Sequence, residues 1–371
     1  MELALVLLVV FVAIAFTYTN GFHDTANAIA TSVATKVMTP NQAIMISTFF
    51  NLVGALMGVA VAKTIGTGLV DMHLINLTTV LCCLVSAIAW NVLTWWVGLP
   101  SSSSHALVGG LIGAALASAG GNWDAIIWYR HTAIDPITHA AVELPFFKSE
   151  GLWPKVLAPM IIAPAAGMVF GFAVMGILYL VFRSLRPRSV NYVSARLQWG
   201  TAMWMSLEHG RNDAQKNMGI IALALVIATQ TGALNGIPSW LEWLRMPEFT
   251  ITLWMKLVCA ITIGVGTAAG GWKIIKTMGS GMVRLQPVNG LVAQGAAAGI
   301  IGAATGMGIP LSTTQVISSS IMGVGASKRL GAVKWLVAER MLWAWVFTIP
   351  ATGALAFGMV WLLQKAGMAG H

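Results

Sequence analysis

Residues 20–27 (Asn-Gly-Phe-His-Asp-Thr-Ala-Asn) lie inside an otherwise apolar stretch that extends from Leu3 to Ala34. Such a stretch is long enough to cross a bilayer as a helix. Only helices and closed barrels can do so, because the bilayer core offers no water to backbone N–H and C=O groups. Carboxylate, imidazole and amide groups at that depth are costly, and they usually face a cavity, a partner helix or an ion path. We therefore expect a membrane helix that carries a functional polar cassette.

The cassette recurs at residues 209–217 (His-Gly-Arg-Asn-Asp-Ala-Gln-Lys-Asn), again within a mostly apolar segment, 199–230. Asp24 aligns with Asp213, and Asn27 aligns with Lys216. We expect each helix to break at its cassette, because freed backbone carbonyl groups would then join the carboxylates. Carboxylate, amide and carbonyl oxygens together suit a proton or a hard monovalent cation.

The composition places the whole chain in the bilayer. It is 57% hydrophobic and only 9% charged, whereas roughly a quarter of the residues of a soluble domain are charged. The net charge of +9 comes from cations in short loops beside apolar segments, which favours membrane topology over nucleic-acid binding. Cys82, Cys83 and Cys259 lack metal-ligand spacing, so we predict no cofactor beyond a coupling ion.

The chain divides into ten apolar segments. Two of them, 105–120 and 315–325, are too short to cross a membrane alone and fit half-helices or re-entrant hairpin arms. The loop 121–154 is polar and mixed in charge, which predicts an extramembrane loop. The linker 183–198 carries four arginines and no acid, so it is predicted to be cytoplasmic. The segments lie at 3–36, 42–65, 74–97, 105–120, 155–182, 199–230, 250–271, 288–307, 315–325 and 337–363.

A second motif is also repeated. Residues 98–105 read Gly-Leu-Pro-Ser-Ser-Ser-Ser-His, and residues 308–315 read Gly-Ile-Pro-Leu-Ser-Thr-Thr-Gln. Cassette, apolar segments and this motif follow in the same order in residues 1–182 and 199–371, and the loops at equivalent positions differ in charge. These features indicate an all-α polytopic membrane protein built from two inverted-topology repeats, with broken helices and re-entrant helical hairpins.

The chemistry of the second motif suits an anion. Pro100 and Pro310 should end the preceding helix, and the hydroxyl residues after them should cap a new one. Two helix N-termini with added hydroxyl donors could hold one tetrahedral oxyanion. The alternative is that these turns merely connect helices.

The cassettes also leave alternatives open. Asp213 could be a structural ion-pair partner of Lys216 or Arg211. Lys216 could add positive charge to an anion site, or it could pair permanently with Asp213 or Glu208. His23 could carry a coupling proton, because an imidazole titrates near physiological pH, or it could simply pack beside Asp24. His105 and His209 are weaker candidates.

Both cassettes and both Gly-x-Pro-hydroxyl motifs closely resemble the paired signatures of the inorganic phosphate transporter (PiT) family. The resemblance covers nearly the whole chain and implies a symporter that moves inorganic phosphate with a cation. The family pattern often has Gly-Ala-Asn-Asp where this chain has Gly-Phe-His-Asp at 21–24. That variant resembles the bacterial proton-coupled, low-affinity branch, which can carry phosphate as a neutral metal complex. Arg211 stands where a small residue is usual.

We therefore predict a bacterial inner-membrane symporter of phosphate and a proton or sodium ion, with lipid as its surroundings and a homo-oligomer as one option. His23, Asp24 and Asp213 are the predicted coupling residues, and the two aspartates would ligate a metal ion only if sodium is the coupling ion. The alternatives are a sulfate permease, a passive channel, or an intramembrane enzyme that uses Ser103 or Ser104 with His105. The predicted substrate contacts are Asn27, Ser101, Ser102, Ser103, Ser104, Asn212, Gln215, Lys216, Ser312, Thr313 and Thr314.

Overall fold

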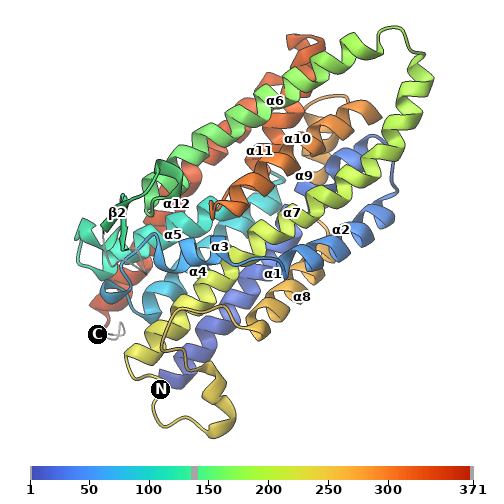
Figure 1. Ribbon diagram of the computed structural model, residues 1–371. Helices are drawn as coiled ribbons and strands as arrows, with labels where there is room; N and C mark the ends of the chain where they lie inside the picture. Colours follow the sequence, from blue (N-terminus) through green and yellow to red (C-terminus); the bar gives the residue numbers. More distant parts are fainter. Residues whose placement is uncertain (1, 135–140, 368–371) are drawn as a thin grey trace.

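The computed structural model describes residues 2–134 and 141–367, and this part of the chain is almost entirely helical (Figure 1). Five of its helices, namely α1, α4, α10, α12 and α6 with the π-helical turn before it, are long and apolar enough to cross a membrane. The first half contains α1 (Glu2–Ala34), α2 (Pro40–Ala55), α3 (Ala60–Thr67), α4 (Leu77–Val97), α5 (Ser103–Ser118) and α6 (Ala158–Phe182). The second half contains α7 (Pro187–Gln230), α8 (Leu253–Ala269), α9 (Trp272–Lys276), α10 (Pro287–Gly306), α11 (Thr313–Lys328) and α12 (Trp335–Lys365).

The two halves repeat the same order of elements. A long helix that carries the cassette, α1 or α7, is followed by a bent pair, with bends of 69° between α2 and α3 and 64° between α8 and α9. Counting each bent pair as one span raises the number of candidate spans among the described residues to seven. A hairpin and a closing helix come next, namely α4–α5 and α6 in the first half and α10–α11 and α12 in the second.

The two hairpins enter the molecule from opposite ends and meet at their tips. At the open end of α4–α5, the hydroxyl of Thr79 contacts that of Ser118. The open end of α10–α11 lies at a basic cavity of about 480 Å³ that includes Lys328 and Arg329. Between the tips, Ser104 Oγ donates a hydrogen bond to the backbone oxygen of Leu311 (3.2 Å). The short hydroxyl-rich helices are therefore hairpin arms, as predicted.

One expectation is wrong: neither cassette breaks its helix. Asp24 lies inside the continuous 33-residue helix α1, and Asp213 lies inside the continuous 44-residue helix α7. Hydroxyl groups of the hairpins bond Asp24, Asn27 Nδ2 and Asn212 Nδ2 while both helices stay continuous. The glycines keep the helices close: a Cβ on Gly21 would lie 2.6 Å from a backbone oxygen of α8, and one on Gly210 would lie 2.2 Å from a backbone oxygen of α2.

The segments between the spans also differ in detail from the expectation. Most of the linker 183–198 is helical, because α7 begins at Pro187 with proline in its first turn, where the missing N–H costs nothing. Residues 135–140 of the loop 121–154 lie outside the described residues. The rest of that loop forms short turns and a two-stranded ribbon, β1 (Thr132–Ile134) with β2 (Ala141–Glu143). The remaining short helices are η1 (Met72–Leu74), η2 (Trp123–Ala125), η3 (Phe146–Lys148), η4 (Trp153–Leu157), η5 (Ser239–Leu244), η6 (Thr277–Gly281) and η7 (Leu330–Ala332).

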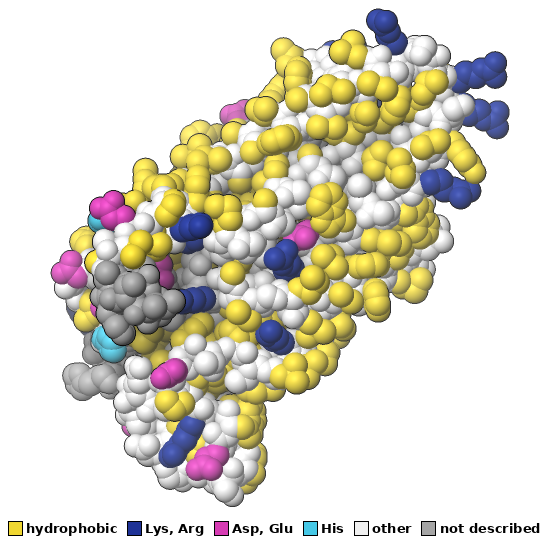
Figure 2. Space-filling model, viewed as in Figure 1, with side chains coloured by type: hydrophobic (Ala, Val, Ile, Leu, Met, Phe, Trp, Pro, Cys, Tyr) yellow, Lys and Arg dark blue, Asp and Glu magenta, His cyan; other side chains and the backbone are white. Residues whose placement is uncertain are grey.

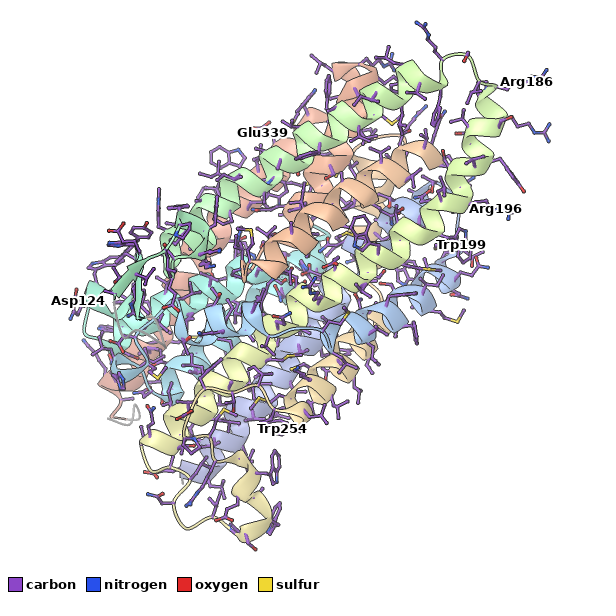
Figure 3. All side chains as sticks on the ribbon, viewed as in Figure 1. Asp124, Arg186, Arg196, Trp199, Trp254 and Glu339 are labelled. Carbon is purple, nitrogen blue, oxygen red and sulfur yellow. The ribbon has the colours of Figure 1, made fainter. Side chains whose placement is uncertain are left out.

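The surface is apolar along its flanks, as a bilayer requires, and its two ends differ in charge. Apolar side chains cover the flanks in Figure 2, and residues such as Phe11, Ile161 and Leu180 are more than 60% exposed. A group of Lys and Arg side chains projects from the end where α6 joins α7, and most of the visible acidic side chains lie toward the other end. Figure 3 labels Arg186 and Arg196 at the first end and Asp124 at the other.

Candidate functional site

Both hairpin tips begin a helix where the proline and hydroxyl residues predicted one. Gly98 ends α4 with φ +75°, and Ser102 caps α5 by accepting a hydrogen bond from the backbone N–H of His105 (3.1 Å). Gly308 has φ +68°, and Ser312 caps α11 by accepting from the backbone N–H of Gln315 (3.4 Å). The positive φ values favour glycine at both turns. Two helix N-termini thus face each other at the centre of the protein.

Asp24 of α1 joins the two tips. One carboxylate oxygen, Oδ2, accepts a hydrogen bond from Ser103 Oγ at the start of α5. The other, Oδ1, accepts from Thr314 Oγ1 of α11 (3.3 Å) and lies 2.8 Å from His23 Nδ1. The same carboxylate therefore contacts a hydroxyl from each repeat and an imidazole.

Asp213 of α7 has the symmetry-related position with different partners. Its Oδ1 accepts from Lys216 Nζ (2.5 Å), and its Oδ2 accepts from Thr313 Oγ1 (3.4 Å). His209 Nε2 lies 3.1 Å from Oδ2, a distance for an ion pair, although its direction is not that of a hydrogen bond. Of the alternatives above, the Lys216 pair is present, whereas Arg211 pairs with Glu208 (3.3 Å).

His23 connects Asp24 to the first hairpin. Its Nε2 lies 3.0 Å from Thr94 Oγ1 and 3.4 Å from Ser101 Oγ. Thr94 Oγ1 accepts from Ser101 Oγ (2.9 Å) and donates to the backbone oxygen of Trp90 (2.9 Å). The imidazole is therefore held between a carboxylate and a pair of hydroxyl groups.

The three predicted amide residues lie in different parts of the structure. Asn27 Nδ2 donates to Thr313 Oγ1 (3.0 Å) and Thr314 Oγ1 (2.9 Å), so it lies in the cluster. Asn212 Nδ2 donates to Thr305 Oγ1 (2.7 Å), on the second hairpin. Gln215 instead bonds the backbone at the α2–α3 bend, through Met57 O and Val61 N. The structure does not bring Gln215 into the cluster.

All fourteen predicted coupling and substrate-contact residues are buried, with at most 4% of each exposed. Donor atoms of Asp24, His209 and Asp213 all lie within 4.8 Å of one another, close enough to share one small cation. The two cassettes and the two hairpin tips thus form one enclosed polar site between the repeats. This is the position that an inverted-repeat transporter would give its substrate.

Three residues that contribute to the site are poorly indicated by the sequence. His209 lies one helical turn before Asp213, a spacing that could have raised its rank. Thr94 and Asn51 carried no local signal, and Asn51 Oδ1 accepts from His209 Nδ1 (3.0 Å) only because the fold brings α2 against α7. His105 instead lies 3.4 Å from Gln315 Nε2. Ser103 donates to Asp24 and Ser104 to Leu311 O, so neither serine is paired with His105 in the described contacts, as the enzyme alternative would require.

Comparisons with known proteins agree with this architecture. A family model described as the phosphate transporter family matches residues 20–356. The chain is 42% identical to a probable low-affinity inorganic phosphate transporter of Bacillus subtilis (96% of this chain, 97% of the relative). It is 38% identical to a protein of the same description from Rhizobium meliloti (95% and 96%).

A solved structure of a sodium-dependent phosphate transporter has the same fold, with a TM-score of 0.78, 20% identity and coverage of 98% of this chain and 99% of the other. At that identity the likeness concerns the fold alone. The family model, however, spans both cassettes and both hairpin tips, and the relatives match nearly the whole chain. The protein therefore belongs to the phosphate transporter family, and it is a multi-pass membrane transporter rather than an enzyme.

Proposed function

We propose that this protein is a secondary transporter that moves inorganic phosphate together with protons by alternating access. The observation that carries the proposal is the meeting of two capped helix N-termini, each with hydroxyl donors, at two buried aspartates. Helix N-termini and hydroxyl groups bind oxyanions without a fixed positive charge. The names of the relatives and of the family support phosphate as that oxyanion.

The charge of the site explains why a cation must accompany the anion. Asp24 and Asp213 carry two negative charges when ionised and Lys216 carries one positive charge, so the enclosed cluster is net negative with both histidines neutral. An anion entering such a site pays electrostatic repulsion in a low dielectric. Binding one proton or cation at Asp24 brings these residues to neutrality, so anion and cation binding favour each other.

The contacts of His23 favour a proton in this role. Thr94 Oγ1 donates to the Trp90 carbonyl, so it accepts from His23 Nε2–H. The 2.8 Å contact between His23 Nδ1 and Asp24 Oδ1 then needs a proton of its own. Protons on both ring nitrogens of His23 beside an ionised Asp24 would satisfy both contacts, and this is the arrangement expected of a proton-loaded carrier.

The hairpins supply the route for alternating access. Their tips reach the site from opposite ends, so moving one tip would expose the site to one side only. A cavity of about 700 Å³ beside the first tip includes Thr94, Gly98 and Arg340 among its lining residues. Thr94, the partner of His23, thus lies in the wall of this cavity.

Phosphate and sulfate are both tetrahedral, but they differ in what they can donate. Phosphate near neutral pH keeps a proton and can donate it in a hydrogen bond to Asp24 or Asp213 when that carboxylate is ionised, whereas sulfate cannot. The two acceptors in the cluster therefore favour phosphate over the sulfate alternative.

Uptake of radiolabelled phosphate into proteoliposomes tests the proposal. We expect accumulation when a pH gradient is imposed, a weaker response to a sodium gradient, and little competition from excess sulfate. An arm with a chelator of divalent cations decides whether the cargo is phosphate or a metal–phosphate complex. Absence of gradient-driven accumulation, or loss of uptake in excess sulfate, would refute phosphate symport.

Site variants test the coupling residues. Asp24→Asn and Asp213→Asn should each abolish coupled uptake, and His23→Gln should abolish the response to the pH gradient while phosphate exchange between the two sides continues. His73→Gln, in an exposed turn far from the site, is the matched control. Proton-driven uptake at the wild-type rate in His23→Gln would exclude His23 as the carrier.

We further propose that the basic end of the molecule faces the cytoplasm of a bacterial cell. Positive loops remain on that side during membrane insertion. A membrane-impermeant maleimide applied to intact spheroplasts should label Lys148→Cys and should leave Ser184→Cys unmodified. The opposite pattern would reverse the orientation.

A further inference from the structure

Lys216 occupies the position that Asn27 has in the other repeat, and its ammonium group has an unusual set of partners. Nζ lies 2.5 Å from Asp213 Oδ1 and 2.7 Å from the backbone oxygen of Leu311, and it also contacts Ser104 Oγ. The side chain is 1% exposed. A carboxylate, a carbonyl and a hydroxyl oxygen, taken from both repeats, therefore surround one positive charge.

Asn27 also contacts hydroxyl groups of the opposite hairpin, but it carries no charge. Its Nδ2 donates to Thr313 and Thr314, the hydroxyl residues that correspond to Ser103 and Ser104, and its Oδ1 is buried without a hydrogen-bond partner. The contact of Asn27 with Thr314 thus corresponds to that of Lys216 with Ser104, and the two positions differ by one unit of charge beside the carboxylate.

All three N–H donors of the ammonium group are used by protein oxygens. A lysine ammonium has three donors and no acceptor, and Asp213, Leu311 and Ser104 take one each. None is left to bond an oxyanion in this arrangement. Lys216 therefore acts here through its charge, and direct anchoring of the substrate by Lys216, as the sequence suggested, does not fit these contacts.

We infer that the Lys216 ammonium is a tethered cation that fills the second of two symmetry-related cation positions. Asp213, Leu311 O and Ser104 Oγ form the oxygen set that a hard monovalent cation prefers, and the ammonium group takes the place of that ion. Only the position at Asp24 then exchanges its proton or cation in each cycle. The inference rests on the proposed symport and names the residue that sets how many cations accompany each phosphate.

A simple structural salt bridge would not require this placement. A pair between Asp213 and Lys216 alone could form anywhere along α7, because residues three apart lie on one face. Here the ammonium group also joins Ser104 at the tip of the first hairpin to Leu311 at the tip of the second. Its charge is thus fixed at the junction that must open and close during transport.

The test replaces the ammonium group with the amide found in the other repeat. Lys216→Asn should create a vacant oxygen site beside Asp213, and sodium should bind there. Purified in detergent without phosphate, the variant should gain a saturable rise in Tm of about 3 °C or more in NaCl over N-methyl-D-glucamine chloride of equal ionic strength. Wild type should show no such difference, and Asp213→Asn/Lys216→Asn should lose it again.

A second measurement counts the cations. From the gradients at which net phosphate flux reverses in proteoliposomes, Lys216→Asn should need one more cation per phosphate than wild type, whereas Lys216→Arg, which keeps the charge, should need the same number. An unchanged number in Lys216→Asn, or the absence of a sodium effect on its Tm, overturns the inference. Failure of wild type to transport phosphate would instead count against the proposed function, because the Tm measurement needs no phosphate.

Failure of Lys216→Asn to fold also tests the inference. If Lys216→Asn is recovered folded in sodium but not in N-methyl-D-glucamine, the bound ion replaces the missing charge, as the inference requires. If it is lost in both salts, the position does not accept a free cation and the inference is wrong.

Discussion

The tip of each hairpin is held by a threonine from the opposite repeat, and this pair of contacts gives a prediction for how the site opens. Thr64 Oγ1 of α3 donates to the backbone oxygen of Gly308 (2.7 Å). Thr277 Oγ1, just after α9, donates to the backbone oxygen of Gly98 (3.0 Å). Both hydroxyl groups are only half-buried. Replacing either threonine with the isosteric valine removes one hydrogen bond from one tip only.

The free-energy change of each variant can be worked out from the hydrogen bond that the tip carbonyl loses. A hydrogen bond contributes about 0.5–1.5 kcal/mol, and a carbonyl left buried without a partner costs about 1–3 kcal/mol. The Thr64 bond is the shorter of the two and is expected at the upper end of the range for a hydrogen bond. We therefore expect Thr64→Val to weaken closure at Gly308 by about 1.5 kcal/mol. Each hydroxyl also has an acceptor one turn earlier, Ala60 O at 3.4 Å for Thr64 and Lys273 O at 3.2 Å for Thr277. Because the bond from Thr277 to the tip is the longer one and its second acceptor is the nearer one, we expect about 1 kcal/mol for Thr277→Val. These energies correspond to roughly tenfold and fivefold changes in the open population.

Cysteine labelling can measure each tip separately. Ile309→Cys reports on the second tip and Leu99→Cys on the first, and both replace residues at equivalent turn positions. The native cysteines are buried. Thr64→Val should raise the rate of maleimide labelling about tenfold at position 309 and leave position 99 unchanged or slower.

Thr277→Val should do the reverse, with a change of about fivefold at position 99. Thr64→Ser and Thr277→Ser keep the hydroxyl groups and serve as controls. Equal increases at both tips in either valine variant would mean general loosening, and no increase at either tip would mean that these bonds do not hold the closed state. Each result would refute the reasoning.

Two further predictions concern packing and the outer loop. Gly113→Ala would place a Cβ 2.0 Å from a backbone oxygen of α12, so we expect about 3 kcal/mol of destabilisation and a clearly lower Tm in detergent, whereas Gly176→Ala, with open space around it, should leave Tm unchanged. Lys155 is buried and donates to the backbone oxygen of Met307 (2.9 Å). Lys155→Met should therefore loosen the second tip from the loop before α6, seen as faster hydrogen exchange there, and unchanged exchange would contradict this role.

The parts of this architecture that local chemistry dictates were predictable from the sequence. Proline removes a donor and ends a helix, hydroxyl residues cap the next one, and glycine permits the positive φ of the turn, so both hairpin tips were placed correctly. The recurrence of both motifs then indicated two repeats. The family resemblance named the cargo, which the residues alone left open between two tetrahedral anions.

The continuity of the cassette helices was not predictable in the same way, because the partners of their polar groups lie far away in the sequence. The Nδ2 group of Asn27 donates to Thr313 and Thr314 from the other repeat. Judged locally, a buried asparagine without a partner is costly enough to suggest a broken helix. The pairing of His209 with α2 likewise depends on the close approach at Gly210, which no local pattern announces.

The continuity of the two cassette helices has a mechanistic consequence. If the helices had broken at the cassettes, the aspartates would lie on short, movable half-helices. Instead, Asp24 and Asp213 are fixed on the two long continuous helices, and the hydroxyl groups that meet them come from the hairpin tips. A charge held on a rigid element needs little reorganisation when a proton binds, whereas a tip held by one threonine hydrogen bond can be released at a cost of only about 1–2 kcal/mol. In the proposed symport, this division into fixed carboxylates and movable hydroxyl groups is what would couple the proton to the hairpins. Neutralising the charge of Asp24 would change the strength of its hydrogen bonds to Ser103 and Thr314, and so the position of both tips.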